Sequence, residues 1–424
     1  MFSEEVESHA ELNPDEKIDL LKVGMLLDKE FPPDPRVENE AKTLTDSGYD
    51  VYLWCLDFCG RKKFEEYRGI KIFRHSISRK AQHQLLGLAM TVPFYHFIFR
   101  NSIRRFLSEN QIRIVHVHDL PLARTLLRLN SHSAYHLVLD LHENRPEIMK
   151  MYSIARRFPQ KIVINLPGWK KYEEEAVQQV DDVIVVTDEA KKELCTRTRI
   201  NLSKITVVPN SICLNEYSSS PIRTDIVSRY SQNFTLCYIG DTSLRRGIDV
   251  VLRAIPSLRE EISELKFVVV GSSSEDKLLH RMVNRLGIHN TVDFVGWQHQ
   301  DSLLSYIKAA DVCISPLKRN LHHDTTLPNK LFQYMAGQKP MIVSNCPAQK
   351  NLVERSGCGL SFESENSADL KDKLLRLYHD PSLREKMGRK GYDSLEQHYQ
   401  WSVVSQTLVE LYSRIADNTK DHPS

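Results

Sequence analysis

Short aliphatic runs alternate with amphipathic segments along most of the chain. Continuous apolar runs of this length are typical of strands that are buried on both faces of a parallel sheet, and the segments between them have helical character. Each run ends in polar residues. The first series covers residues 21–28, 49–57, 112–120, 136–144, 181–190 and 204–212. The pattern predicts successive strand–helix–strand units.

A second series of the same kind follows. Its runs cover residues 234–241, 265–274, 292–297, 310–318, 339–345 and 358–363. The sequence after them is helical to about residue 416. We expect an α/β fold of two Rossmann-like domains that face a central cleft, one over residues 20–213 and one over 214–396. A final helix over 397–416 is expected to cross back and pack on the first domain, and the cleft is the expected site.

Composition narrows the class of protein. The chain has 424 residues, of which 41% are hydrophobic and 26% charged, as in ordinary globular proteins. A net charge of +2 argues against a nucleic-acid partner held by bulk charge. Eight cysteines are scattered without a CxxC pair, which indicates reduced thiols and a cytoplasmic location. Residues 1–19 are acidic and have no signal-peptide pattern, so we expect a disordered tail.

One apolar and aromatic segment, 85–100, leaves two interpretations open. It is shorter than the roughly 20 residues that a membrane-spanning helix needs. It contacts either the protein core, as an amphipathic helix, or the inner face of a membrane as a peripheral element. The basic residues around it are Arg79, Lys80, Arg100, Arg104 and Arg105.

Several common site motifs do not occur in the sequence. There is no GxGxxG, no GxxxxGK[ST] and no GxSxG, and no DxD pair that would hold a divalent metal. We therefore expect neither a cofactor nor a metal. The remaining chemistry lies in polar loops and helix starts that suit anions.

The loop after the run 234–240 is the first of these anion-binding candidates. Arg245 and Arg246 precede Gly247, which opens a predicted helix. Positive charge beside the free N–H groups of a helix start attracts anions. Two solvated arginines are the alternative interpretation.

The strand ends of the first domain carry further candidates. His142 and Glu143 follow a buried strand, where a histidine can bind a sugar or phosphate oxygen or transfer a proton. A structural histidine is the alternative, and the same two interpretations apply to His116, His118 and Asp119. Asp34 and Arg36 lie at the first strand-to-helix turn. They are expected to lie under an incoming substrate, and a helix cap is the alternative interpretation.

These segments, in their order along the chain, resemble the retaining, GT-B-fold glycosyltransferases of the group 1 (GT4-like) family over about residues 20–415. The resemblance implies a nucleotide-diphosphate sugar held mainly by the second domain and a glycan or lipid-linked acceptor held mainly by the first. It further implies metal-independent transfer in surface polysaccharide or glycoconjugate biosynthesis. The matching blocks are FPPDPRVENEAKTLTDSGYDV, VHVHDLP, LDLHEN, DDVIVVTDEAKKEL, ITVVPNSI, YIGDTSLRRGIDVVLRA, VDFVGW, AADVCISPLK and LPNKLFQYMAGQKPMIVSN.

The resemblance also assigns roles to residues. Arg246 matches the lysine that contacts the donor diphosphate in the family, and His142 matches the histidine near the transferred sugar. Lys330 lies in the segment that matches the helix start whose N–H groups meet the phosphates. These three are the expected catalytic residues. The expected donor-binding residues are Gly240, Asp241, Arg245, Gly271, Ser272, Gly296, Trp297, Thr325, Thr326, Leu327, Asn329 and Gln333. The expected acceptor-binding residues are Asp34, Arg36, His118, Asp119 and Glu143.

The sequence departs from the family pattern at three of these positions. Thr325 and Gln333 stand where many relatives have glutamates, and an amide can hydrogen-bond a ribose diol but supplies no charge. Asp241 replaces an arginine, for which Arg245 is the available substitute. These departures keep two other functions open. One is a binding or scaffold protein that no longer catalyses, and the other is a sugar-nucleotide epimerase on the same fold.

Overall fold

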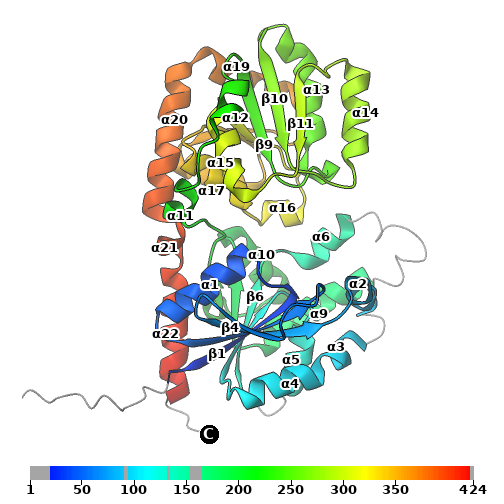
Figure 1. Cartoon of the computed structure of the whole chain (residues 1–424), viewed down its shortest axis with the longest axis vertical. Coiled ribbons are helices and arrows are strands. Elements are labelled where there is room, and N and C mark those ends of the chain that lie inside the picture. The colour runs from blue at the N-terminus through cyan, green and yellow to red at the C-terminus, as the bar shows by residue number, and fades with distance from the viewer. Residues whose placement is uncertain (1–19, 90–93, 131–133, 152–164, 421–424) are drawn as a thin grey trace, which may run out of the picture.

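A computed structural model describes residues 20–89, 94–130, 134–151 and 165–420. The tail expected at 1–19 lies outside the described residues. Two α/β domains lie one above the other, each with a sheet covered by helices, and a column of helices runs along one side of both (Figure 1). Within the described residues, no helix combines the length and the apolar character that crossing a membrane requires.

The first domain is built on an eight-stranded sheet in the order β3-β4-β2-β1-β5-β6-β7-β8. All neighbours are parallel except the β3–β4 pair. The strands are β1 (Lys22–Glu30), β2 (Asp50–Asp57), β3 (Phe64–Tyr67), β4 (Ile70–Ser76), β5 (Ile114–His118), β6 (His136–Leu141), β7 (Asp182–Val185) and β8 (Ile205–Val207). The helices are α1 (Pro35–Asp46), α2 (Arg79–Leu88), α3 (Phe94–Ile98), α4 (Arg100–Glu109), α5 (Ala123–Leu129), α6 (Arg145–Met151), α9 (Leu166–Gln179) and α10 (Asp188–Thr198).

The second domain has a six-stranded parallel sheet in the order β11-β10-β9-β12-β13-β14. Its strands are β9 (Phe234–Ile239), β10 (Leu265–Val270), β11 (Val292–Gly296), β12 (Val312–Ser315), β13 (Met341–Ser344) and β14 (Gly359–Phe362). Its helices are α11 (Leu214–Ser218), α12 (Thr224–Arg229), α13 (Ile248–Arg259), α14 (Asp276–Leu286), α15 (Gln300–Ala309), α16 (Leu321–Asp324), α17 (Asn329–Ala336), α18 (Pro347–Ser356), α19 (Ser367–His379) and α20 (Pro381–Ser394).

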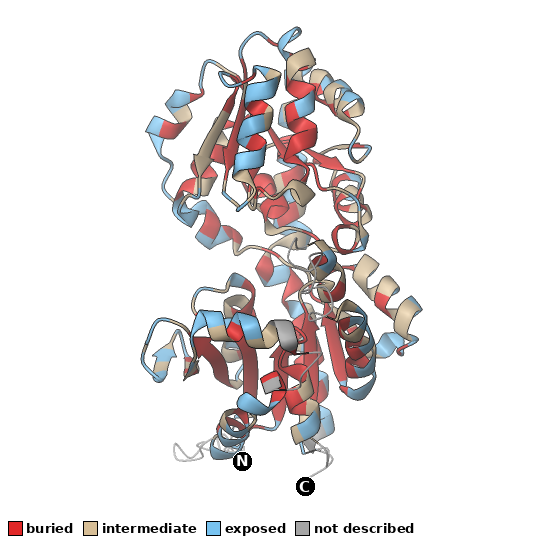
Figure 2. Ribbon diagram, turned by 90° about the vertical axis from the view of Figure 1, so that its right-hand side faces the viewer, coloured by how far each residue is buried: buried red, intermediate tan, exposed pale blue. Residues whose placement is uncertain are grey.

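The central strands of both sheets are buried, as their apolar sequences predict, whereas the edge strands β3, β11 and β14 are partly exposed and the helices expose one face to solvent (Figure 2). Every run of the two predicted series forms a strand, so the predicted α/β fold with two parallel sheets is confirmed. The domain boundary at residue 213 stays a prediction.

The hairpin of β3 and β4 was not predicted, because its strands lack the continuous aliphatic run that the other strands share. A local signal was present in the sequence. Arg68 and Gly69 join the strands with φ angles of 51° and 78°. Two successive residues with positive φ make the tight turn that favours glycine between antiparallel strands.

The last helices return to the first domain, as predicted. α20 descends beside the second domain, and α21 (Trp401–Val404) and α22 (Gln406–Lys420) continue beside the first (Figure 1). The Trp401 indole N–H donates to Thr43 Oγ1 on α1 (2.9 Å). Leu408, Leu411, Tyr412 and Ile415 are buried in the same apolar cluster as residues of β1 and β2. The returning helix is therefore part of the core of the first domain.

Polar contacts fix the two domains against each other near the carboxyl ends of both sheets. Thr187, which caps α10, donates its hydroxyl to the main-chain oxygen of Thr325 (2.6 Å). The amide of Asn210 donates to the main-chain oxygen of Leu327 (3.4 Å). Both acceptors lie in the segment that leads into α17, so the start of that helix faces the first domain.

Candidate active site

Two glycine turns bring the loops after β9 and β10 into contact. Gly240 has a φ of 126° and Gly271 a φ of 137°, a region that side-chain-bearing residues rarely adopt. A Cβ on Gly271 would lie 2.0 Å from the main-chain oxygen of Gly240. Both glycines are among the expected donor-binding residues, and their backbones lie in direct contact.

Asp241 holds both arginines of the first anion-binding loop. Its Oδ2 atom lies 2.7 Å from Arg245 Nη2 and 3.5 Å from Arg246 Nε. Its carboxylate also accepts hydrogen bonds from the N–H and the hydroxyl of Ser243. Burial raises the pKa of Asp241, but the hydrogen bonds from Ser243 and the charges of Arg246 and Arg245 lower it below its ordinary value. The residue that replaces the family's arginine therefore acts as a counter-ion for its neighbours.

Lys330 is a buried basic residue at the start of α17. Its residue is only 7% exposed, and its Nζ atom lies 3.8 Å from the centroid of the Tyr238 ring. Burial, followed by the charge of Arg246, lowers the pKa of Lys330 well below its ordinary value. Within the part of the chain that the structure describes, Lys330 forms no ion pair. An anion beside Lys330 would favour its charged form and raise this pKa again.

The residues before Lys330 turn their side chains in different directions. The Thr325 and Thr326 hydroxyls donate to main-chain oxygens of α16, at Leu321 (2.8 Å) and His322 (3.0 Å) respectively. Leu327 is buried. In Asn329, the side-chain oxygen Oδ1 is buried and accepts no hydrogen bond from the described residues. Thr325 thus stabilises a local turn, whereas Asn329 keeps an unused acceptor at the helix start.

Opposite this surface, Asp140 and His142 form the centre of the first domain's polar edge. His142 Nε2 lies 2.7 Å from Asp140 Oδ2, and His142 Nδ1 lies 3.9 Å from Asp119 Oδ2. Burial alone lowers the pKa of the His142 imidazole, but the carboxylates of Asp140 and Asp119 outweigh it and raise that pKa to about 9. His142 is therefore an imidazolium at neutral pH, which donates hydrogen bonds and accepts no proton.

Arg36 and His118, both expected to bind acceptor, are buried beneath His142. Arg36 donates to both oxygens of Asp140 (3.0 and 2.9 Å) and to the main-chain oxygen of Val208 (3.0 Å). His118 Nδ1 lies 3.2 Å from His142 Nε2. Asp34, a third such residue, is the N-cap of α1, and its Oδ1 accepts from the Val37 N–H (3.3 Å). In this structure the alternative interpretations, a cap and a structural histidine, describe these side chains.

Glu143 lines a cavity between the two domains, whereas Asp119 is buried beside His142. Asp119 Oδ1 accepts from the His142 N–H (3.3 Å), and Lys29 Nζ lies 3.7 Å from its other oxygen. Burial raises the pKa of Glu143, with the charge of Asp119 adding to the effect. Carboxyl groups at a strand edge can accept hydrogen bonds from sugar hydroxyls, which is the role expected of an acceptor site.

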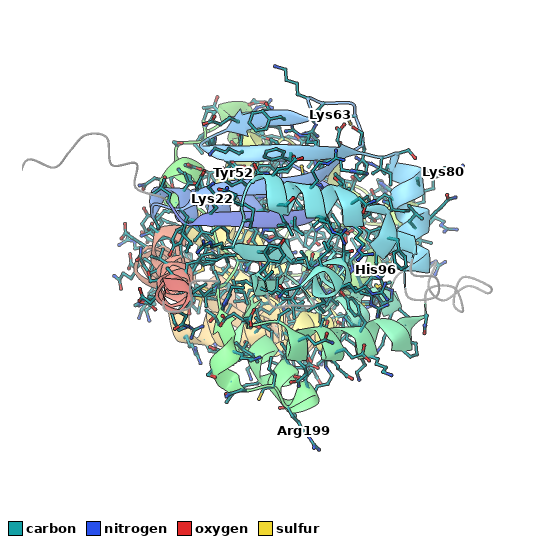
Figure 3. All side chains as sticks on the ribbon, turned by 90° about the horizontal axis from the view of Figure 1, so that it is seen from below. Lys22, Tyr52, Lys63, Lys80, His96 and Arg199 are labelled. Atoms are coloured by element: carbon teal, nitrogen blue, oxygen red, sulfur yellow. The ribbon has the colours of Figure 1, made fainter. Side chains whose placement is uncertain are left out.

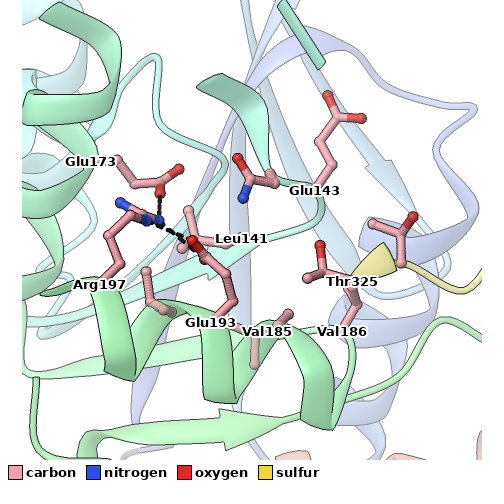
Figure 4. Close-up of a pocket in the computed structure, with 12 residues that line it drawn as sticks. Leu141, Glu143, Glu173, Val185, Val186, Glu193, Arg197 and Thr325 are labelled. Carbon is pink, nitrogen blue, oxygen red and sulfur yellow. Dashed lines mark hydrogen bonds and ion pairs between the residues drawn. The ribbon is translucent and has the colours of Figure 1, made fainter. Parts of the chain in front are cut away.

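A small cavity lies where the two domains meet (Figure 4). Its volume is about 30 Å³, and it is lined by Glu143 from the first domain and by Thr325 and Thr326 from the second. Arg197 closes one side through ion pairs with Glu173 and Glu193. The predicted acceptor and donor residues thus converge at this point.

A larger cavity of about 560 Å³ lies on the second domain. Asp241, Ser243 and Arg245 line it, together with residues that the sequence did not single out: Ser273, Ser274, Glu275, Lys318, Arg319, Asn320 and Glu365. Met151 at the end of α6 is its lining residue from the first domain. Ser272 is exposed beside it, while Gly296 and the 73% exposed Trp297 do not line it. The nucleotide-base wall expected at Gly296 and Trp297 stays a prediction.

Four buried side chains have the composition of a metal site. The nearest ligand atoms of Glu40, His116, His118 and Asp140 all lie within 4.8 Å of one another, and no other group of this kind occurs among the described residues. However, Asp140 already accepts hydrogen bonds from Arg36 on both oxygens and lies in contact with the charged His142. Its charge is thus compensated without an ion, and none of the four residues lines the cavity of the second domain.

The two facing α/β domains form the GT-B fold. Sucrose-phosphate synthase from Thermosynechococcus elongatus superimposes with a TM-score of 0.75 at 15% identity, covering 94% of this chain and all of the other. Anabaena HepE, solved in complex with UDP, gives a TM-score of 0.68 at 14% identity and covers 93% of this chain and all of HepE. At these identities the comparison establishes the fold alone.

Sequence comparisons identify the family. The family "Glycosyltransferase Family 4" matches residues 36–216, and "Glycosyl transferases group 1" matches residues 224–394. Alpha-D-kanosaminyltransferase of Streptomyces kanamyceticus is 19% identical over 66% of this chain and 70% of its own length. Phosphatidyl-myo-inositol mannosyltransferase of Mycobacterium leprae is 24% identical over 49% of this chain and 53% of its own length. The chain belongs to the group 1, family 4 glycosyltransferases.

The contact between the two glycine turns gives the first prediction. We expect Gly271→Ala to lower the free energy of unfolding by about 3 kcal/mol, because backbone strain of ~1–2 kcal/mol adds to the clash with Gly240. Gly287→Ala is the matched control, since Gly287 also has a positive φ (64°) but has open space around its Cβ position. It should cost only about 1 kcal/mol. Urea denaturation measures both, and equal losses would contradict the close approach.

Proposed function

We propose that this protein is a retaining, metal-independent glycosyltransferase that moves a sugar from a nucleotide-diphosphate sugar to a glycan or lipid-linked acceptor. Three basic residues carry this proposal: Arg245 and Arg246 lie in the loop before α13, and Lys330 lies at the start of α17, close enough for the charges of both arginines to lower its pKa. They lie on the second domain, which faces the edge of the first domain where His142 lies. HepE binds UDP, and the mycobacterial relative is a phosphatidyl-myo-inositol mannosyltransferase, which supports a nucleotide donor and a lipid-linked acceptor. Surface polysaccharide or glycoconjugate assembly is the process proposed.

On the donor side, a diphosphate would compete with Asp241 for the two arginines. Arg245 and Arg246 then turn from an internal counter-ion to the phosphates, while Lys330 gains the partner that it lacks. Charge develops on the diphosphate as the bond to the sugar breaks. Cations that are already in place stabilise such a leaving group without a metal ion.

On the acceptor side, His142 supplies charge rather than base catalysis. Its imidazolium lies between Asp140 and Asp119, so it can donate hydrogen bonds to the transferred sugar but cannot take the acceptor proton. Asp119 and Glu143 are the proposed contacts of acceptor hydroxyls. In this proposal Arg36 and His118 are buried residues that support Asp140 and His142, and Asp34 caps the start of α1.

The donor site is tested with purified protein and a panel of nucleoside diphosphates and nucleotide sugars. At least one should raise the melting temperature, because a ligand that binds only the folded state stabilises it. Arg246→Gln or Lys330→Met should weaken this ligand at least tenfold, the effect of about 1.5–3 kcal/mol for a lost charged contact. Arg259→Gln is the control, because Arg259 lies at the far end of α13 and donates to Gly287. No binding by any donor would contradict the proposal, as would activity that needs an added metal.

The charge state of His142 predicts a pH profile. Its pKa is raised to about 9, so the imidazolium and its contribution are present below that value and are lost as the pH rises through it. We expect kcat to be level between about pH 7 and 8 and to fall above about pH 9. His142→Gln should lower kcat and remove this particular decline. A wild-type rate that instead rises through pH 6.5 would show a neutral histidine acting as base.

A basic and partly apolar surface on the first domain supports a peripheral membrane contact. Phe97 and Ile98 on α3 are 49% and 43% exposed. Arg79 and Lys80 on α2, with Arg104 and Arg105 on α4, are exposed in the same part of the domain. Lys80 lies at the outer edge in the view from below, whereas His96 is buried (Figure 3). Exposed aromatic residues with basic neighbours suit an anionic lipid surface.

Liposome co-sedimentation tests this contact. Vesicles with anionic lipid should bind the protein, and neutral vesicles should bind it weakly, because each basic residue adds about 1 kcal/mol near an anionic surface. Phe97→Ser together with Arg104→Gln should reduce binding at least tenfold. Lys373→Gln on α19 of the second domain serves as a charge-matched control. Equal binding to both kinds of vesicle, or to neither, would contradict the proposal.

A further inference from the structure

The ring of His142 is fixed from one side by a carboxylate that cannot turn. Asp140 lies at the carboxyl end of β6, two residues before His142, and its Oδ2 is 2.7 Å from His142 Nε2. Arg36 donates through Nε and Nη2 to the two oxygens of Asp140, a bidentate geometry that fixes the carboxylate plane. Arg36 is in turn held by Val208 beyond β8. Three separate elements thus set the direction of one hydrogen bond.

A second chain of contacts reaches His142 from the returning C-terminal helix. The Tyr412 hydroxyl on α22 lies 2.8 Å from His116 Nδ1. The His116 ring stacks on His118 with 4.5 Å between centroids, and His118 Nδ1 lies 3.2 Å from His142 Nε2. Tyr412, His116 and His118 are all fully buried. None of the proposed steps at the cleft uses Tyr412 or His116.

We propose that Asp140 and Tyr412 are positioning residues that together hold the ring of His142 toward the transferred sugar. Asp140 acts by a direct hydrogen bond, and Tyr412 acts through the stacked pair His116 and His118. The inference rests on the proposed glycosyltransferase function and adds to it a role for the helix that returns from the second domain. The packing of α22 on the first domain then helps to orient His142, which precedes Tyr412 by 270 residues in the chain.

The first domain contains a matched control pair. At the other end of β6, His136 Nε2 lies 2.8 Å from Asp182 Oδ2, and Arg414 on α22 pairs with the other oxygen of Asp182 (2.6 Å). Asp182→Asn therefore makes the same chemical change in a histidine–aspartate–arginine group that touches the same helix. It differs from Asp140→Asn in lying at the amino end of the strand, away from the cleft.

Steady-state kinetics with the donor found in the panel provides the first test. Asp140→Asn should lower kcat about ten- to a hundredfold, and Tyr412→Phe about three- to tenfold, the range for losing one hydrogen bond to a charged or neutral group. The KM for the donor and its dissociation constant should stay within about twofold, because neither residue touches the donor. Asp182→Asn should leave kcat within about twofold. A loss of donor binding equal to the loss of kcat, or equal losses in the control, would overturn the proposal.

Nuclear magnetic resonance of ¹⁵N-labelled histidines provides a readout that does not depend on turnover. The buried Nε2–H of His142, assigned with His142→Gln, should give a downfield proton signal that Asp140→Asn abolishes and Tyr412→Phe shifts. Asp182→Asn should change the signal of His136 instead. An unchanged His142 signal in both variants would overturn the positioning role, as would one equivalent of tightly bound metal on these histidines. If the protein transfers no sugar at all, the proposed function fails while this measurement still decides the positioning.

Discussion

The buried ion pair between Arg36 and Asp140 is the interaction on which the polar edge of the first domain depends. Removing both charges from water is costly, and only a bidentate geometry with further hydrogen bonds compensates for it. Arg36 satisfies this condition by also binding Val208, and Asp140 by also binding His142. The pair therefore fixes α1, β6 and the segment after β8 in one arrangement. Burial and the neighbouring Asp140 charge raise the pKa of Glu40 to about 8, although the charge of Arg36 acts in the opposite direction. The Glu40 carboxyl is therefore mostly protonated at neutral pH and adds little charge of its own.

The edges of the two domains that face each other carry opposite kinds of charged groups. The first domain concentrates carboxylates around one imidazolium, which leaves hydrogen-bond acceptors for neutral hydroxyl groups. The second places Arg245 and Arg246 around Asp241 and keeps Lys330 without an ion-pair partner among the described residues. A negatively charged ligand is thus favoured on one side only. Asp241 neutralises part of the charge of the two arginines, so in the proposed mechanism a diphosphate competes with it for them.

The fold followed from the sequence because buried parallel strands have a strong local signal, as in VVV at 268–270. The hairpin around Arg68 and Gly69 was missed because its strands mix apolar and charged residues and contain no continuous aliphatic run. The site followed only in part. The loop positions of Arg246, His142 and Lys330 come from strand and helix ends, which the pattern locates. The partners Glu40, Asp140 and Tyr412 depend on long-range packing: Tyr412 meets His116 across 296 positions of sequence, and no local pattern encodes such a pair. An aspartate within the apolar run HLVLDL was the available signal for Asp140.

The exchange of a glutamate for Thr325 is consistent with the way the domains are joined. The Thr325 hydroxyl is used within the turn after α16, and its main-chain oxygen accepts from Thr187 of the first domain. A carboxylate at this position would need a partner in a largely buried place, next to Thr326 and close to Glu143 across the small cavity. With threonine the position carries no charge, so the charge of the donor site comes from the loop at Arg245 and Arg246 and from Lys330. At the edge that faces the first domain, α17 contributes Lys330 and the N–H groups of its first turn but no acidic side chain.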